Sequence, residues 1–221
     1  MPMKWFAIES SSPRVSLAFG EGDAVEREVA AEGEASRLIE RLFRELAPDL
    51  DAVQACLLGR GPGSYNGLRV GYAFLKGLFC LRPVPVAELP TPLLLARQVA
   101  AARLSGAGRI LVVNHARRGE LYGAWVRASQ ESLAVEWEFT GVESDLRTRY
   151  DSTPEAVVTW DFAPASLSRL GGMPVYREFP RAGGMAAAAR QAGISFSADL
   201  SRLEPAYVRP PVAVGFARQR S

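Results

Sequence analysis

The sequence predicts an α/β fold made of two halves with similar architecture. The first half has the order β-β-β-α-β-α-β-α, in which an antiparallel meander precedes alternating helices and strands. The glycine-containing stretch "LSGAGR" at 104–109 then marks a boundary. Beyond it, "ILVVN", "LYGAWVRA" and "LAVEWEFTGV" form a second meander. We therefore expect two domains, at residues 1–105 and 106–221.

Composition limits the class of protein. With 221 residues, 48% of them hydrophobic and 23% charged, the chain can bury a sizeable core. The net charge of +2 is too small for a stand-alone nucleic-acid binder, so contact with RNA would need a partner. The start "MPMKWFAIESSS" lacks signal-peptide features, and no run approaches the ~18 apolar residues of a membrane span. We expect a cytoplasmic protein without membrane contact.

The first half begins with the strands "KWFAIES", "RVSLAFG" and "AVEREVA", with a turn at "EGD". A helix over 35–47 follows, with Leu38, Ile39, Leu42 and Phe43 on its apolar face, and Pro48 ends it. "AVQACLLG" has the apolar composition of a buried strand. The remaining elements are a helix at about 64–80, the strand "VPVAEL" and a helix from Thr91 to Arg103.

The second half gives weaker signals after its meander. "AVVTWD" and "MPVYREF" are short strand candidates, and helices are expected at 163–170 and 184–192. The end, "LEPAYVRPPVAVGFARQRS", holds three prolines and basic residues, which favours an extended arm over a helix.

A glycine-rich turn, "GRGPGSYNG" at 59–67, connects a strand to the helix at 64–80. A helix N-terminus after such a turn can bind an anion through free backbone N–H groups. The P-loop lysine is absent, and the dinucleotide pattern of glycines is not matched. A tight turn capped by Ser64 is the alternative. Both interpretations stay open, and the possible nucleotide-binding residues are Glu9, Ser10, Gly61, Gly63 and Ser64.

The helix at 64–80 is apolar on more than one side. Glycines recur every four residues along it, which would let another backbone approach closely. Two apolar rows run beside them, so the helix needs cover on several faces. The cover can come from a partner protein or from this chain alone. The residues expected at a partner interface are Leu38, Leu42, Gly63, Gly67, Leu68, Gly71, Tyr72, Phe74, Leu75, Leu78 and Phe79.

The stretch "LLGRGPGSYNGLRVGYAFLKGL" resembles the signature of the TsaB family, bacterial proteins that assist in making threonylcarbamoyladenosine in tRNA. Asn66 stands where the family usually has threonine. "ARRGELYGAWV" and "EPAYVR" are similar to two further family elements. "AIESSSPRVSLAF" resembles the first hairpin, with Glu9 in place of the usual aspartate. Together these segments span 5–209 in the family's order.

This resemblance implies the actin, hexokinase and Hsp70-like (ASKHA) fold, with two RNase H-like subdomains whose mixed sheets are flanked by helices. It also implies a TsaD-like catalytic partner, which transfers the threonylcarbamoyl group to N6 of the adenosine next to the anticodon. A TsaE-like ATPase joins such assemblies. The chain is expected to contact tRNA only indirectly, through the complex. Helices equivalent to 35–47 and 64–80 pack against the partner as a bundle.

Catalytic chemistry within this chain has little support. Glu9 is the one carboxylate at the end of the first strand, and His115 is the only histidine, so a paired-histidine metal site is impossible. The two cysteines lie in apolar runs. The wider family carries the older label glycoprotease, but this sequence contains neither the nucleophile constellation nor the metal-binding cluster that a protease would need. We predict no metal and no required cofactor, although ATP or ADP is possible at the partner interface.

The predicted function is a non-catalytic scaffold or dimerisation subunit that binds the TsaD-like protein. One alternative is a self-sufficient ATP-binding transferase or ATPase of the same fold. Another is a homodimeric interaction module with no tRNA role. A homodimer in isolation is compatible with the scaffold reading as well, because one apolar face can serve both partners.

Overall fold

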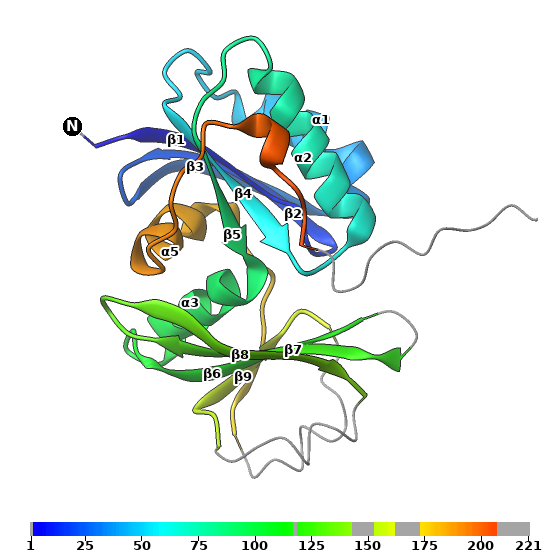
Figure 1. Cartoon of the computed structure of the whole chain (residues 1–221), viewed down its shortest axis with the longest axis vertical. Helices are drawn as coiled ribbons and strands as arrows, with labels where there is room; N and C mark the ends of the chain where they lie inside the picture. Colours follow the sequence, from blue (N-terminus) through cyan, green and yellow to red (C-terminus); the bar gives the residue numbers. More distant parts are fainter. Residues whose placement is uncertain (1, 117–118, 143–152, 162–172, 207–221) are drawn as a thin grey trace, which may run out of the picture.

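The computed structural model describes residues 2–116, 119–142, 153–161 and 173–206. Two five-stranded sheets lie one above the other, with α3 (Thr91–Arg103) and α5 (Met185–Gln191) between them (Figure 1). On the other face of the first sheet lie α1 (Ala35–Leu46) and α2 (Tyr65–Phe79). Among the described residues, no helix is long and apolar enough to cross a membrane.

The first sheet is mixed, with the strand order β3-β2-β1-β4-β5. Its first three strands pair antiparallel, while β4 pairs in parallel with both β1 and β5. This is the order of an RNase H-like sheet. The strands are β1 (Lys4–Glu9), β2 (Arg14–Glu21), β3 (Ala24–Glu32), β4 (Ala55–Gly61) and β5 (Val86–Pro90).

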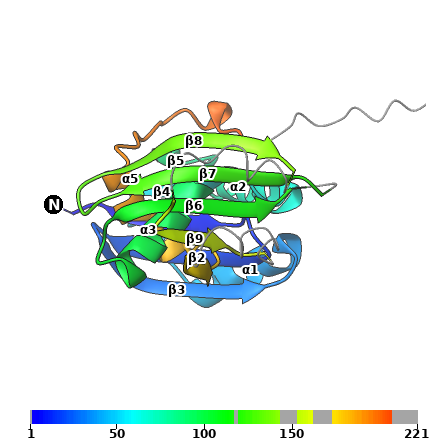
Figure 2. The same cartoon turned by 90° about the horizontal axis from the view of Figure 1, so that it is seen from below.

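The second sheet repeats this topology, with the order β10-β9-β6-β7-β8 (Figure 2). A meander again comes first, followed by two parallel strands on the other side of its first strand. The predicted fold class, two RNase H-like units with mixed sheets, is confirmed. The predicted helix at 163–170 lies outside the described residues. The strands are β6 (Gly108–His115), β7 (Leu121–Ala128), β8 (Leu133–Gly141), β9 (Ala156–Thr159) and β10 (Val175–Arg177).

Strand β1 contributes to two cores because its alternate side chains point to opposite faces of the sheet. Phe6 and Ile8 pack with α1 and α2 in the first core. Trp5 and Ala7 pack with α3, α5 and the second sheet in a central core. The central core therefore joins the two sheets through the helices between them.

After β10 the chain returns to the first sheet. The short helix η3 (Ala182–Gly184) and α5 follow, and Ser197 bridges to β5. Next comes η4 (Leu200–Arg202), and Leu203 is buried in the first core. The division at 105 assigned this return segment to the second domain, whereas it packs on the first sheet. The predicted arm beyond 206 lies outside the described residues.

Candidate protein-binding face and the strand ends beside it

The glycine-rich turn between β4 and α2 is a tight, capped turn. Gly61 has a φ of +93°, which glycine adopts without strain. Ser64 caps α2, since its Oγ accepts the backbone N–H of Gly67 at 3.2 Å. The Ser64 N–H donates to the carbonyl of Ser11 at 2.6 Å, which fixes the turn against the end of β1.

The glycine row of α2 faces this chain and not a partner. A Cβ on Gly63 would lie 2.1 Å from the Ser11 carbonyl oxygen, and one on Gly67 would lie 2.1 Å from that of Ser10. At Gly71 the Cβ would lie 2.4 Å from Ser10 Oγ. The predicted close approach is therefore real, but the segment that approaches is the one following β1. Gly67 and Gly71 are buried and do not form a docking surface, whereas Gly63 is exposed and stays a predicted contact.

Five further residues predicted at the interface are buried inside the chain. They pack against the first sheet, and their exposed fractions are between 0 and 4%. Contact with a partner would require exposing the first core, so these predictions are wrong for the folded protein. The residues are Leu42, Leu68, Tyr72, Leu75 and Phe79.

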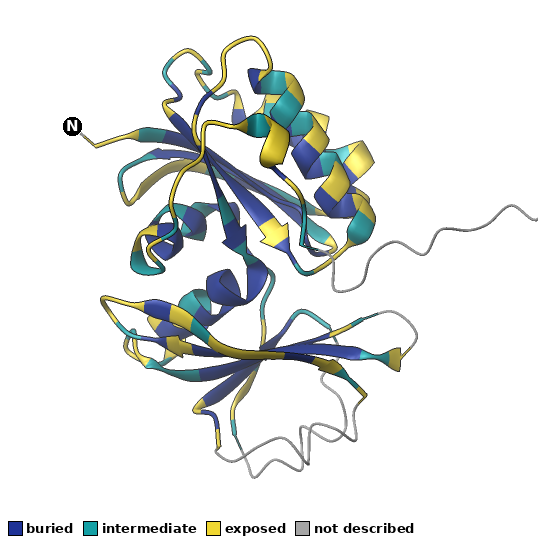
Figure 3. Ribbon diagram, in the orientation of Figure 1, coloured by how far each residue is buried: buried dark blue, intermediate teal, exposed yellow. Residues whose placement is uncertain are grey.

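A second row on α2 remains accessible from outside (Figure 3). Val70, Phe74 and Leu78 are half-buried at its base. Ala73 and Gly77 are exposed, and a Cβ on Gly77 would meet nothing within 4 Å. Leu81, just beyond the helix, is 95% exposed. We call this set the outer strip: Phe43, Val70, Ala73, Phe74, Gly77, Leu78 and Leu81.

Helix α1 joins the outer strip through Phe43, which is also half-buried. Its ring meets Phe74 edge to face. The sequence predicts Leu38 and Leu42 as the contacts from α1, and Leu42 is buried. Leu38 is half-buried next to Gly33, at the turn from β3 into α1. The periodicity of α1 placed Leu38 and Phe43 on one broad apolar face and did not separate its two sides.

Glu9 ends β1 as a fully buried carboxyl. Its Oε1 accepts the Ser11 N–H at 2.6 Å, while Oε2 is buried without a hydrogen-bond partner. Burial raises the pKa of this carboxyl, and the hydrogen bonds from Ser11 and Ser10 oppose that rise. Oε2 packs against Gly59, where a Cβ would lie 2.2 Å away. This environment therefore shifts Glu9 toward its neutral form relative to a carboxyl in water.

The predicted nucleotide-binding residues gather around the end of β1. Ser64 bonds to Ser11, and Gly63 contacts the same residue. Ser10, however, is only 1% exposed. The structure brings the set together but encloses its acidic member, so a nucleotide site here stays a prediction. Among the described residues, no three His, Cys, Asp or Glu side chains cluster in a way that could hold a metal ion.

Tyr72 links α2 to two other elements. Its hydroxyl hydrogen bonds to the carboxylate of Glu88 on β5 and lies 3.3 Å from the carbonyl oxygen of Glu204. Burial, followed by the nearby carboxylate, raises the pKa of Tyr72, so the phenol stays protonated. Sequence reasoning placed Tyr72 in an apolar row and missed Glu88 and Glu204, because no local pattern pairs residues so far apart.

His115 is the last residue of β6, and its backbone is tied to Asp161. Its backbone N–H donates to Asp161 Oδ2 at 2.7 Å, and its ring Nδ1 lies 3.8 Å from the same oxygen. The imidazole is 47% exposed. Arg117 and Arg118, next in sequence, lie outside the described residues.

Comparison with known proteins identifies the family of this chain. A family model described as TsaD, tRNA N6-adenosine threonylcarbamoyltransferase, matches residues 31–209. The chain belongs to this family. Curated relatives named tRNA threonylcarbamoyladenosine biosynthesis protein TsaB place it in the TsaB group. The one from Escherichia coli K12 is 28% identical over 110 residues, which is 50% of this chain and 46% of that relative.

A second TsaB relative, from Haemophilus influenzae, is 34% identical over 85 residues, covering 38% of this chain and 35% of that protein. The chain thus spans less than half the length of the curated relatives it matches. Among solved structures, YeaZ from Pseudomonas aeruginosa superposes with a TM-score of 0.76 at 19% identity, covering 93% of this chain and all of that one. A structure described as similar to peptidase YEAZ gives 0.75 at the same identity, covering 94% of this chain and 100% of that one. These two likenesses show a shared fold.

Proposed function

We propose that this protein is a non-catalytic subunit that binds a TsaD-like catalytic partner. In this role it supports transfer of a threonylcarbamoyl group to N6 of the adenosine next to the anticodon in tRNA. The family match and the two TsaB relatives support the pathway. The structural support for partner binding is a single feature, the outer strip on α1 and α2.

The outer strip suits a helical partner. Apolar side chains line it, while the exposed Ala73 and Gly77 leave room for a second backbone to approach. Its margins are polar: Arg69 stacks on Tyr65 at 5.3 Å on α2, and Glu40 pairs with Arg44 on α1. An apolar centre with a charged margin is the usual anatomy of a protein interface.

The state of Glu9 argues against a self-sufficient ATPase. Metal-dependent phosphoryl transfer needs an ionised carboxylate that can reach a metal or its water. Glu9 instead has a raised pKa, and its Oε2 packs against Gly59. We therefore assign the transfer chemistry to the partner. A TsaE-like ATPase and tRNA would join through that partner, and a nucleotide at the partner interface remains part of the proposal.

Reconstitution tests this function. The TsaD-like subunit of the same organism, with its adenylate substrate and tRNA, is assayed alone and with this protein, and the protein is assayed alone. Modification is expected only when both subunits are present, together with co-elution of the pair. Full activity of the TsaD-like subunit alone would overturn the supporting role. Transfer by this protein alone would overturn its non-catalytic status.

Self-association through the same strip is the second candidate, favoured by the 95% exposure of Leu81. Sedimentation of the isolated protein measures it. A homodimer that the TsaD-like subunit dissociates is consistent with the proposal, because one face serves both contacts. A tight homodimer that ignores the TsaD-like subunit would instead support an interaction module without a tRNA role.

A further inference from the structure

The chain passes between the two sheets by different routes in each direction. It leaves the first sheet through α3 and the loop 104–107, where Ser105 and Gly106 have positive φ values of 54° and 88°. It returns through residues 178–184, which we call the strap. The strap begins after β10, at the second sheet, contains η3 and leads into α5. Both η3 and α5 pack on the first sheet.

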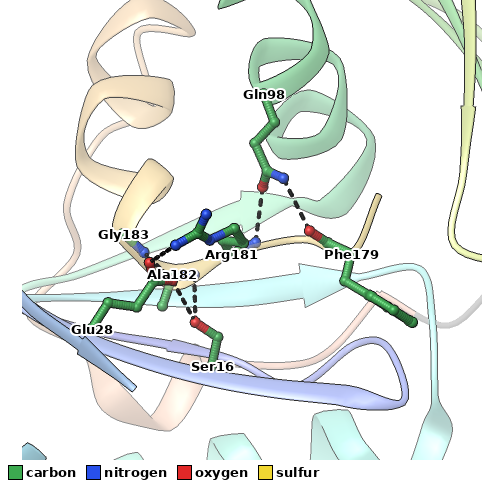
Figure 4. Close-up of polar contacts among 7 residues, drawn as sticks. All are labelled: Ser16, Glu28, Gln98, Phe179, Arg181, Ala182 and Gly183. Atoms are coloured by element: carbon green, nitrogen blue, oxygen red, sulfur yellow. Dashed lines mark hydrogen bonds and ion pairs between the residues drawn. The ribbon is translucent and has the colours of Figure 1, made fainter. Parts of the chain in front are cut away.

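Glu28 on β3 holds the strap at its far end (Figure 4). One carboxylate oxygen accepts the Ser16 hydroxyl at 2.7 Å and the Gly183 N–H at 3.1 Å. The other accepts the Arg181 guanidinium at 2.7 Å. Three segments of the chain therefore meet on one carboxylate, whose side chain is only 14% exposed. Charge-assisted hydrogen bonds of this kind are stronger than neutral ones.

At its start the strap still bonds to the second sheet, since the Glu178 N–H donates to the Thr159 carbonyl of β9 at 2.9 Å. Beyond Glu178, side chains hold its backbone. Gln98 on α3 accepts the Arg181 N–H at 2.8 Å and donates to the Phe179 carbonyl at 3.0 Å. Ser16 Oγ accepts the Ala182 N–H at 3.0 Å, and Ala182 is fully buried. Gln98 thus binds the strap from α3, and Ser16 binds it from the first sheet (Figure 4).

Gly183 fits the carboxylate closely. A Cβ at this position would lie 2.9 Å from Glu28 Oε2, so even an alanine would press on the carboxylate. Removing the Glu28 carboxylate would leave the buried Ser16 hydroxyl and the half-buried Gly183 N–H without this acceptor, and the exposed Arg181 without its ion pair. Because a buried donor without an acceptor is unfavourable, we expect the strap to detach from the first sheet.

From these contacts we propose that the strap is a latch, with Glu28 as the positioning residue that closes it. The closed latch fixes α5 against the first sheet and, together with the central core, sets the orientation of the second sheet relative to the first. When it opens, the loop 104–107 and α3 remain as the connection, and the second sheet shifts over α3. This inference does not depend on the proposed partner.

Spin-label distances test the latch in the full chain. Cys80 is an exposed thiol near the first sheet, whereas Cys56 is buried. A second label at Glu131→Cys, an exposed position between β7 and β8, reports on the second sheet. Labelled protein is diluted into unlabelled protein so that only distances within one chain are read. The test variant is Glu28→Ala, and Glu26→Ala, exposed on the same strand, is the matched control.

The proposal predicts one narrow distance distribution for wild type and Glu26→Ala, and a broadened or shifted one for Glu28→Ala. Hydrogen exchange at the Ala182 and Gly183 amides should accelerate by about tenfold to a hundredfold, as expected for lost hydrogen bonds to a charged group. An unchanged distribution in folded Glu28→Ala overturns the proposal, even if exchange accelerates. If that variant does not fold, Arg181→Gln decides by the same criteria.

Discussion

The rings of Phe43 and Phe74 meet edge to face, with centroids 5.3 Å apart and planes 72° from parallel. Phe43 meets Phe6 of β1 in the same way at 5.9 Å. This chain of rings connects the first sheet to α1 and then to α2. The outer strip is therefore one surface held by the first core, because each aromatic pair favours this geometry beyond its buried area.

Two glycines of α2 should respond in opposite directions to alanine. Gly67→Ala would place a Cβ 2.1 Å from the Ser10 carbonyl oxygen and should destabilise the fold strongly. Gly77→Ala meets nothing within 4 Å and should stabilise the free protein by about 0.5–1 kcal/mol through helix propensity. Urea unfolding measures both changes. Equal effects would contradict the inward orientation of the glycine row.

Leu75 and Leu81 form a second matched pair. Leu75 is 0% exposed, and Leu75→Ala should cost about 2–5 kcal/mol of the free energy of unfolding, since it leaves a cavity. Leu81 is 95% exposed, so Leu81→Ala should change stability by less than about 0.5 kcal/mol. Chemical denaturation of the isolated protein gives both values. If Leu75→Ala changes the free energy of unfolding only slightly, Leu75 is not part of the core and is available to a partner.

The contribution of Glu9 to the free energy of unfolding should fall as pH rises. Its folded pKa is raised above the unfolded reference of 4.5, so its contribution is fully present below that value and is lost as pH rises through the folded pKa. Glu9→Gln cannot ionise and should become progressively more stable relative to wild type over this range. Unfolding free energies across a pH series measure the difference. A constant difference would show that folding does not raise the pKa of Glu9.

Glu28 should act in the opposite sense. Hydrogen bonds from Ser16 and Arg181 hold its pKa below 4.5 despite burial, so its stabilisation is present above that value and is lost as pH falls through the folded pKa. The advantage of wild type over Glu28→Gln should therefore shrink in acid. The same pH series tests this, with Glu26→Gln as the exposed control. An advantage that persists at low pH would mean that the carboxylate charge does not hold the strap.

Much of the fold was accessible from the sequence, because the two meanders and the helix periodicity are local patterns. The strand order of both sheets agreed with the family resemblance, and the capping role of Ser64 was read from the turn itself. The interface prediction was partly wrong for a physical reason. A helix that is apolar on several sides does not reveal which row faces its own sheet, so Leu75 and Phe74 looked equivalent.

The glycine row shows the same limit. Spacing indicated that a backbone approaches Gly67 and Gly71, but the approaching residue, Ser10, lies far away in sequence. The contact between Glu28 and Arg181 is separated even further along the chain and left no local signal. Long-range polar contacts therefore came only from the structure.

Titration of the TsaD-like subunit with wild type, Ala73→Arg and Ala102→Arg measures whether the outer strip binds this partner. Both alanines are exposed on helices, but only Ala73 belongs to the outer strip. If the outer strip is the binding face, Ala73→Arg raises Kd by at least about thirtyfold, a loss of about 2 kcal/mol, while Ala102→Arg binds like wild type. Equal Kd values for all three folded proteins would contradict binding through this face.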